Sequence, residues 1–211
     1  MARRQNTKVL RYYPNEFYLF VCEDEKSMCY YLEGLKPYLK PNIKLEIKHS
    51  NNGTSASKVY ECAEEKYKRI NQNKDAYKKG FKVIACFDKD ENDINDIKSI
   101  MDRKNKKSIP IYNNPCYEFW LYLHMQSNAP IFSSSADCAK RCMNRINRVY
   151  KTHFHSIDEM KRETKIFEIV KKGFVKAIDN AVSLKFTDYG KTYTNTQTVL
   201  AQIVDLEKID K

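Results

Sequence analysis

The sequence predicts an α/β protein with a mostly parallel sheet flanked by helices and a helical extension at its C-terminal end. Two short apolar runs, 17–22 and 83–87, are interpreted as strands that are buried on both faces. Segments of helical periodicity alternate with such strands through the first 125 residues. This alternation favours parallel pairing through crossover helices.

Each expected element of the first half has its own signal. Ser27 is suited to cap a helix whose apolar positions recur at helical spacing before Pro37. Residues 44–49 alternate between polar and apolar, which predicts a strand with one solvent-exposed face. Pro110 favours a sheet edge or a strand end. The expected elements, in chain order, are strand 17–22, a helix after Ser27, strand 44–49, a helix from Ser55 or Ser57 to about Ile70, strand 83–87, helix 94–101 and strand 108–112.

A further helix is expected after the last of these strands. Asn114 fits its N-cap and Pro115 its first position, and the apolar residues continue to Met125. Such a helix is apolar nearly all round and is therefore expected to be buried. Glu118, one turn inside it, is the exception, because a buried carboxylate is costly unless it is paired or bound to a metal.

Helical patterns dominate the second half. The expected helices cover 136–150, from the capping box at Ser156 to Lys172 or to Phe186, and 196–208. The expected organisation is thus an α/β core over 1–130 and a basic helical extension over 131–211 that packs on it.

Composition narrows the class of protein. The 211 residues are 42% hydrophobic and 12% aromatic, as in a globular chain. A net charge of +11 points to a polyanionic partner such as nucleic acid, and a membrane surface fits less well because no amphipathic anchor is present. Seven cysteines without a secretory signal predict reduced thiols in a cytoplasmic protein. The chain has no phosphate-binding loop of an ATPase and no apolar segment long enough to span a membrane.

Acidic clusters follow both buried strands. Glu23 begins one cluster, and Asp88 and Asp90 form the other, where an extended backbone would place them side by side on one face. Parallel strands end at the same sheet edge, where ligands of open α/β sheets bind, and Glu118 could join these acids there. Carboxylates brought together need a cation, and oxygen ligands suit Mg²⁺ or Mn²⁺. Such ions support phosphodiester hydrolysis, although unrelated acidic turns stay open as the alternative.

Other kinds of site fit the sequence less well than a metal site at these acids. A phosphoacceptor receiver domain also has acids at strand ends, but the positive charge and the helical extension fit it poorly. Two cysteines and two histidines could be zinc ligands, but their spacing is not a standard finger, and cysteines four apart also describe one helical face in a core. His124 could contact a phosphate or belong to the core. The zinc candidates are Cys138, Cys142, His153 and His155.

Basic residues of the second half form a stripe. Arg141, Arg145 and Arg148 share one helical face, and Lys151 extends it. Such a stripe can contact nucleic-acid phosphates, or it can be an ordinary solvated face. The overall charge favours phosphate contact.

Three segments together resemble the RloB-like family. The run Val21-Cys22-Glu23-Asp24-Glu25-Lys26-Ser27, followed by Tyr31, is similar to that family's first motif, C-E-G-E-K-T-E-x-x-Y-F. The run Cys86-Phe87-Asp88-Lys89-Asp90-Glu91 matches its F-D-x-D-E segment. The run from Asn113 to His124 resembles S-N-P-x-F-E-x-W-L-L-x-H, the most distinctive motif. Weaker later motifs are matched by Tyr150-Lys151 and by 195–199.

The resemblance implies a TOPRIM-like fold that binds Mg²⁺ through a glutamate after the first strand and an Asp-x-Asp after a later one. It implies Asp88 and Asp90 as metal ligands, Glu23 as a ligand or general acid/base, and Glu118 as a further ligand. It also implies a place in bacterial defence against phage, often beside an ABC-type or AAA ATPase. Two positions depart from the family pattern: Asp24 stands where the family has glycine, and Met28 where it has a second glutamate.

Two main hypotheses follow. The first is a Mg²⁺-dependent nuclease acting on DNA or RNA, with Glu23, Asp88, Asp90 and Glu118 in its catalytic site. The second is a subunit with a degenerate site that binds nucleic acid or regulates a partner ATPase. A purely structural metal is a third interpretation, and self-association of the chain is left open.

Overall fold

The computed structural model of this chain describes residues 16–23, 25–51, 53–73, 77, 80–127 and 130–209. The basic segment before residue 16 and Asp24, one of the two departures from the family pattern, lie outside the described residues.

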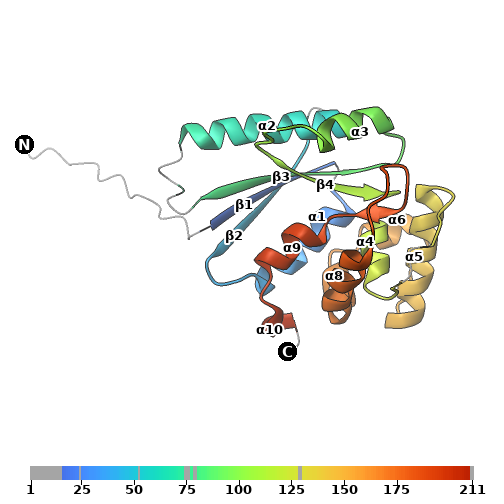
Figure 1. Cartoon of the computed structure of the whole chain (residues 1–211). Helices are drawn as coiled ribbons and strands as arrows, with labels where there is room; N and C mark the ends of the chain where they lie inside the picture. The colour runs from blue at the N-terminus through green and yellow to red at the C-terminus, as the bar shows by residue number, and fades with distance from the viewer. Residues whose placement is uncertain are drawn as a thin grey trace, which may run out of the picture.

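A five-stranded sheet in the order β2-β1-β3-β4-β5 forms the centre of the molecule (Figure 1). Its first four strands are parallel, and a short fifth strand is antiparallel to β4. The prediction of an α/β protein with a mostly parallel sheet is therefore confirmed. The strands are β1 (Glu16–Cys22), β2 (Ile43–His49), β3 (Phe81–Asp88), β4 (Ile109–Asn114) and β5 (Tyr193–Thr194).

The strand order places a topological switch point between β1 and β3. From β1 the chain first moves outward to β2, then crosses back to β3 on the other side of β1. Cys22 pairs with Cys86 in the register of these two strands, so both strands end at nearly the same level. Loops that leave a sheet in opposite directions open a crevice between them, which is where open α/β sheets bind ligands.

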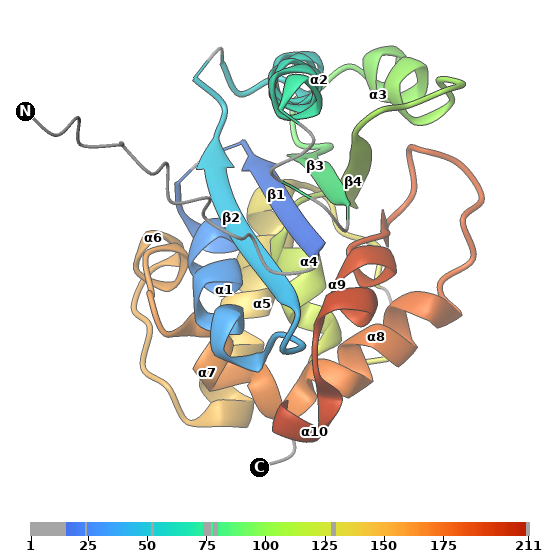
Figure 2. The same ribbon diagram turned by 90° about the vertical axis from the view of Figure 1, so that its left-hand side faces the viewer.

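Helices cover the two faces of the sheet unequally. Figures 1 and 2 show α2 (Ala56–Gln72) and α3 (Ile94–Met101) on one face and all the other helices on the opposite face. Each face has its own apolar cluster, and the larger one includes fully buried Trp120 and Phe167. The helices of this larger layer are α1 (Ser27–Leu35), α4 (Glu118–Leu123), α5 (Ser135–Tyr150), α6 (Ile157–Lys161), α7 (Ile166–Val170), α8 (Phe174–Ser183), α9 (Gln197–Ile203) and α10 (Leu206–Ile209).

The larger apolar cluster contains residues from both sides of position 130, and β5 comes from the second half. The division at this position stays a prediction. Within the described residues, every helix is too short or too polar to cross a bilayer.

The long helix expected after Ser156 is wrong. Ser156 caps a helix as predicted, since its Oγ accepts a hydrogen bond from the amide of Glu159 at 3.1 Å, but α6 ends at Lys161. The chain then forms α7, a 3₁₀ turn and α8. At the last break Gly173 packs so closely on α4 that a Cβ there would lie 2.2 Å from the carbonyl oxygen of His124. Tertiary packing therefore interrupts a continuous helical pattern.

Two other helix predictions need correction. The expected helix 196–208 divides into α9 and α10, because Val204 forms a bridge with Leu39 and Asp205 donates its amide hydrogen bond to Tyr38. The helix expected at Asn114 begins only at Glu118. Asn114 stays in β4, and its side-chain amide donates to the carbonyl of Tyr189 instead of capping a helix.

Candidate functional site

The predicted acids meet in one pocket at the carboxyl ends of β1 and β3. Glu23, Asp88, Asp90 and Glu118 all line this pocket, which has a volume of about 160 Å³. The topology explains the meeting, because Glu23 directly follows β1 and Asp88 ends β3. The remaining lining residues are Cys22, Ser27, Met28, Thr54, Cys86, Tyr117 and Lys161.

Asp88 is held by two hydrogen bonds. The side-chain amide of Asn113 donates to its Oδ1 at 3.1 Å, and the backbone amide of Tyr117 donates to its Oδ2 at 3.0 Å. Burial raises the pKa of Asp88 well above its usual value, and the nearby charges of Glu23 and Glu118 raise it further. The two hydrogen bonds act in the opposite direction. Like charges that repel in a buried place mark a functional-site candidate.

Glu23 touches the same position through the backbone. Its Oε2 accepts a hydrogen bond of 3.2 Å from the amide of Asp88. The carboxyl group of Glu23 is thereby fixed across the β1–β3 boundary next to Asp88. The two acids predicted from separate strand ends are thus brought together.

Glu118 is the most buried of the four acids, with 1% of the residue exposed. Its Oε1 accepts a hydrogen bond of 2.9 Å from the hydroxyl of Ser27, and the ammonium of Lys161 lies 3.6 Å from the same oxygen. Its Oε2 is buried and has no hydrogen-bond partner among the described residues. An unsatisfied buried oxygen is costly and needs an explanation, for which a bound cation is one candidate.

Ser27 does not cap α1 as predicted. It is the first residue of that helix, whose N-cap position is Lys26 with no side-chain capping bond. The hydroxyl donates to Glu118 instead, because a carboxylate buried this deeply is costly without a donor.

Asp90 does not lie beside Asp88 on an extended backbone. β3 ends at Asp88, and Asp90 sits in a turn with a φ of 27°. Its amide donates to the carbonyl of Pro115 at 2.9 Å, which fixes the turn against the segment before α4. Asp90 is exposed yet still lines the pocket, so it reaches the site from the mouth.

A buried polar chain supports Asp88 from the C-terminal half. The hydroxyls of Thr194 and Thr196 both donate to Oδ1 of Asn113, at 2.7 and 2.9 Å. This orients the amide so that its nitrogen faces Asp88. The sequence contained no signal for these hydrogen bonds beyond the neighbouring motifs, since the two threonines lie more than 80 positions from Asn113.

The carboxylate oxygens of the pocket are ligands of the kind that Mg²⁺ prefers, but they do not form a compact cluster. In the part of the chain that the structure describes, no group of three or more His, Cys, Asp or Glu side chains is arranged to hold a metal ion. Mg²⁺ commonly binds through one or two carboxylates and completes its shell with waters and substrate phosphates. The pair Glu23 and Asp88, with the partnerless oxygen of Glu118 in the same pocket, fits that mode of binding.

The other candidate residues lie elsewhere. The side chain of His124 is buried between Tyr31 and the carbonyl of Trp120, each 3.0 Å from a ring nitrogen, and burial lowers its pKa to about 4. It is a neutral core histidine. Cys138 and Cys142 are buried in the core, whereas His153 and His155 are exposed.

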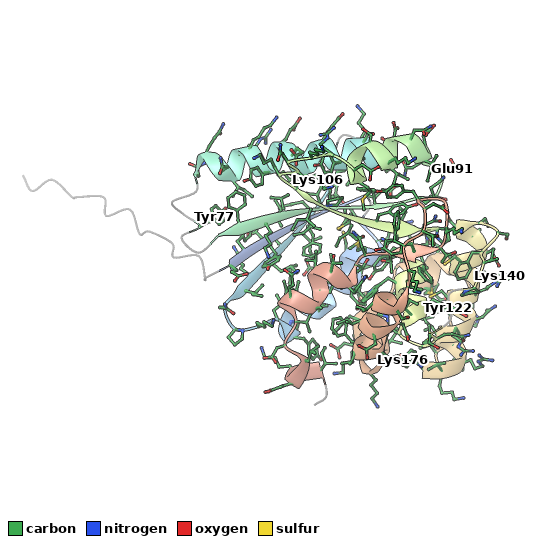
Figure 3. The ribbon with its side chains drawn as sticks, in the orientation of Figure 1. Tyr77, Glu91, Lys106, Tyr122, Lys140 and Lys176 are labelled. Atoms are coloured by element: carbon green, nitrogen blue, oxygen red, sulfur yellow. The ribbon has the colours of Figure 1, made fainter. Side chains whose placement is uncertain are left out.

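The basic stripe runs along α5 toward Lys151. Arg141 is paired with Asp137 at 2.8 Å, Arg145 is half-buried, and Arg148 and Lys151 are exposed. The start of α5 is fixed near the acidic pocket by the hydroxyl of Ser135, which donates to Pro115. In Figure 3 Lys140 on this helix and Glu91 beside the acidic turn lie toward the same end of the molecule.

The fold and the acids at the β1–β3 switch point define the class first: an α/β protein of the Rossmann-like kind that includes TOPRIM-like folds. A family model described as RloB-like protein matches residues 18–206. The chain therefore belongs to the RloB-like family. Neither the comparison with curated proteins nor the comparison with solved structures finds a match.

Proposed function

We propose that this protein is a Mg²⁺-dependent nuclease that hydrolyses phosphodiester bonds of DNA or RNA. One observation carries the proposal: Glu23, Asp88 and Glu118 are gathered in one pocket at the switch point, where their charges repel. The positive charge of the chain supports a nucleic acid as the substrate. A role in defence against phage and an ATPase partner are carried by the family resemblance alone.

Glu23 and Asp88 would hold the ion in this proposal. Both oxygens of Asp88 already accept one hydrogen bond, but a carboxylate has further lone pairs that can bind a cation. When bound, the ion polarises the phosphoryl group and lowers the pKa of water. Asn113 and the amide of Tyr117 keep the Asp88 carboxylate in a single orientation toward the pocket.

Hydrolysis forms one bond from a water oxygen to phosphorus and breaks one phosphorus–oxygen ester bond. The water loses a proton, and the departing oxygen leaves as a hydroxyl after taking one up. A carboxylate of the pocket that does not hold the ion would accept the first proton. Exposed Arg148 in the last turn of α5 and Lys151 just after that helix would contact phosphates farther along the strand.

The test is a cleavage assay with the purified full chain, Mg²⁺ or Mn²⁺, and DNA, messenger RNA and transfer RNA as substrates. Asp88→Asn and Glu23→Gln should each lower the rate by at least about a hundredfold, since a ligand of the ion is lost. Glu25→Gln is the matched control, because Glu25 lies two residues from Glu23 but pairs with His49 outside the pocket. Equal rates in all three variants would contradict the proposal.

A subunit that binds nucleic acid without cleaving it is the second candidate. Met28, which stands where the family has a glutamate, is buried and lines the pocket, so this position supplies no carboxylate. Nucleic-acid binding without cleavage under every metal condition would favour this candidate over the nuclease.

A further inference from the structure

A lysine from the helical half reaches into the acidic pocket. Lys161, the last residue of α6, places its Nζ 3.6 Å from Oε1 of Glu118. It is the one cationic side chain among the described residues that line the pocket. About a third of the Lys161 side chain is exposed, against 2% for Glu118, so the ammonium bridges the buried acid and the open part of the pocket.

The position of Lys161 is fixed by the surroundings of α6. Met160, its neighbour, is 1% exposed and belongs to the large apolar cluster. Asp158 on the same helix pairs with Lys26 at 3.1 Å, which ties α6 to the segment between Glu23 and α1. The ion pair between Lys161 and Glu118 is therefore held by packing on one side and by a second ion pair on the other.

The charges of the pocket divide into two groups. Lys161 faces Glu118, whereas Glu23 accepts a hydrogen bond from the backbone amide of Asp88, and Asp90 lies exposed at the mouth. Met28 offers only a thioether, a soft ligand that hard cations such as Mg²⁺ do not prefer. Among the described residues, the pocket thus has the pair Glu23 and Asp88 for one divalent ion, and an ammonium rather than a further carboxylate beside Glu118.

We propose that Lys161 is the second cation of this site, so that a phosphate group is bound between one divalent ion on Glu23 and Asp88 and the ammonium of Lys161 on Glu118. An ammonium carries three hydrogen-bond donors, so Lys161 can pair with Glu118 and still donate to a phosphate oxygen. This inference rests on the proposed function. It adds that the site takes one metal ion and that the ammonium of Lys161 stands in place of a second metal ion.

The first experiment counts metal ions without using cleavage. Mn²⁺ binding to the full chain is measured by electron paramagnetic resonance, and we expect one ion in the pocket, lost in Asp88→Asn. Lys161→Ala and Lys161→Met should bind Mn²⁺ roughly threefold to tenfold more tightly, or bind a second ion, because a repelling charge is removed. A merely structural role for Lys161 would weaken Mn²⁺ binding instead. Lys165→Ala, an exposed lysine four residues later, is the control and should leave the affinity unchanged.

The second experiment measures phosphate contact. Binding of a short single-stranded oligonucleotide is followed in Ca²⁺, and Lys161→Met should weaken it about fivefold or more and reduce the slope against salt by about one. Lys161→Arg should retain most of the affinity. Lys161→Met also keeps the aliphatic stem, and a thermal melt confirms that α6 still packs.

The outcomes separate the two proposals. If wild-type protein binds one Mn²⁺ but the Lys161 variants match Lys165→Ala in both assays, the role of Lys161 is overturned and the proposed function stands. Two ions in the wild-type pocket would also overturn it. If no form binds Mn²⁺, the proposed function fails, and the role of Lys161 fails with it.

Discussion

The side-chain amide of Asn113 donates a hydrogen bond of 3.1 Å to Oδ1 of Asp88, directly across the pairing of β3 with β4. The two residues are register partners at the carboxyl ends of their strands. Asn113 is itself held by Thr194 and Thr196. The orientation of the central acid thus depends on a short segment near the C-terminal end of the fold.

Asn113→Ala should lower the free energy of unfolding by about 1.5–3 kcal/mol, because it removes a buried hydrogen bond to a carboxylate and leaves two threonine hydroxyls without their acceptor. Activity should fall as well, since Asp88 loses its orientation. Urea unfolding and the cleavage assay measure the two effects. Thr198→Val is the control, because its hydroxyl bonds only locally, to the carbonyl of Asn195. Equal losses in both variants would contradict a specific role for Asn113.

Glu118→Gln should separate stability from function. The substitution removes a buried charge whose Oε2 has no partner, but it also breaks the ion pair with Lys161, which is a third exposed, so without metal the free energy of unfolding should change by no more than about 1–2 kcal/mol. Cleavage should nevertheless fall, because Lys161 loses its anionic partner. Denaturant unfolding with and without Mg²⁺ tests this. A large loss of stability would instead make Glu118 a structural residue.

The buried, neutral side chain of His124 should make the free energy of unfolding depend on pH. Its folded pKa, about 4, lies below the ordinary value of 6.5, so the unfolded chain takes up a proton before the folded one does. The stability due to the neutral ring is complete above pH 6.5 and is lost as the pH falls toward 4. By pH 5 the loss is about 2 kcal/mol. Urea unfolding at pH 7.5 and pH 5 measures it, and His124→Gln should remove this part of the difference. If both proteins change equally, His124 is not its source.

The exposed basic residues of α5 and its end predict affinity for nucleic acid. Arg148→Ala with Lys151→Ala should weaken binding to all sequences and reduce the salt slope by about two. Lys68→Ala with Arg69→Ala is the charge-matched control, on α2 at the opposite face of the sheet (Figure 2). Fluorescence anisotropy at several salt concentrations distinguishes them. The same slope in both double variants would assign binding to net charge rather than to this stripe.

Much of the fold could be predicted from local sequence patterns. The apolar runs 17–22 and 83–87 form β1 and β3, as predicted. These strands are covered by helices on both faces, so neither has a solvent-exposed side that would require polar residues. Helix α3 begins and ends where predicted, and Ser55 and Ser156 cap their helices. Predictions failed where distant contacts overrode a local preference, as at Ser27, Asn114 and Gly173.

The sequence by itself determined the class of fold, the family and which four acids line the pocket. It could do so because apolar periodicity and motif spacing are local properties of the chain. Only the tertiary structure decided which groups meet at those acids. Lys161 approaches Glu118, and Thr194 orients Asn113 toward Asp88, across sequence separations that no periodicity encodes. The physical reason is that buried carboxylates must find donors and cations wherever the packed chain brings them.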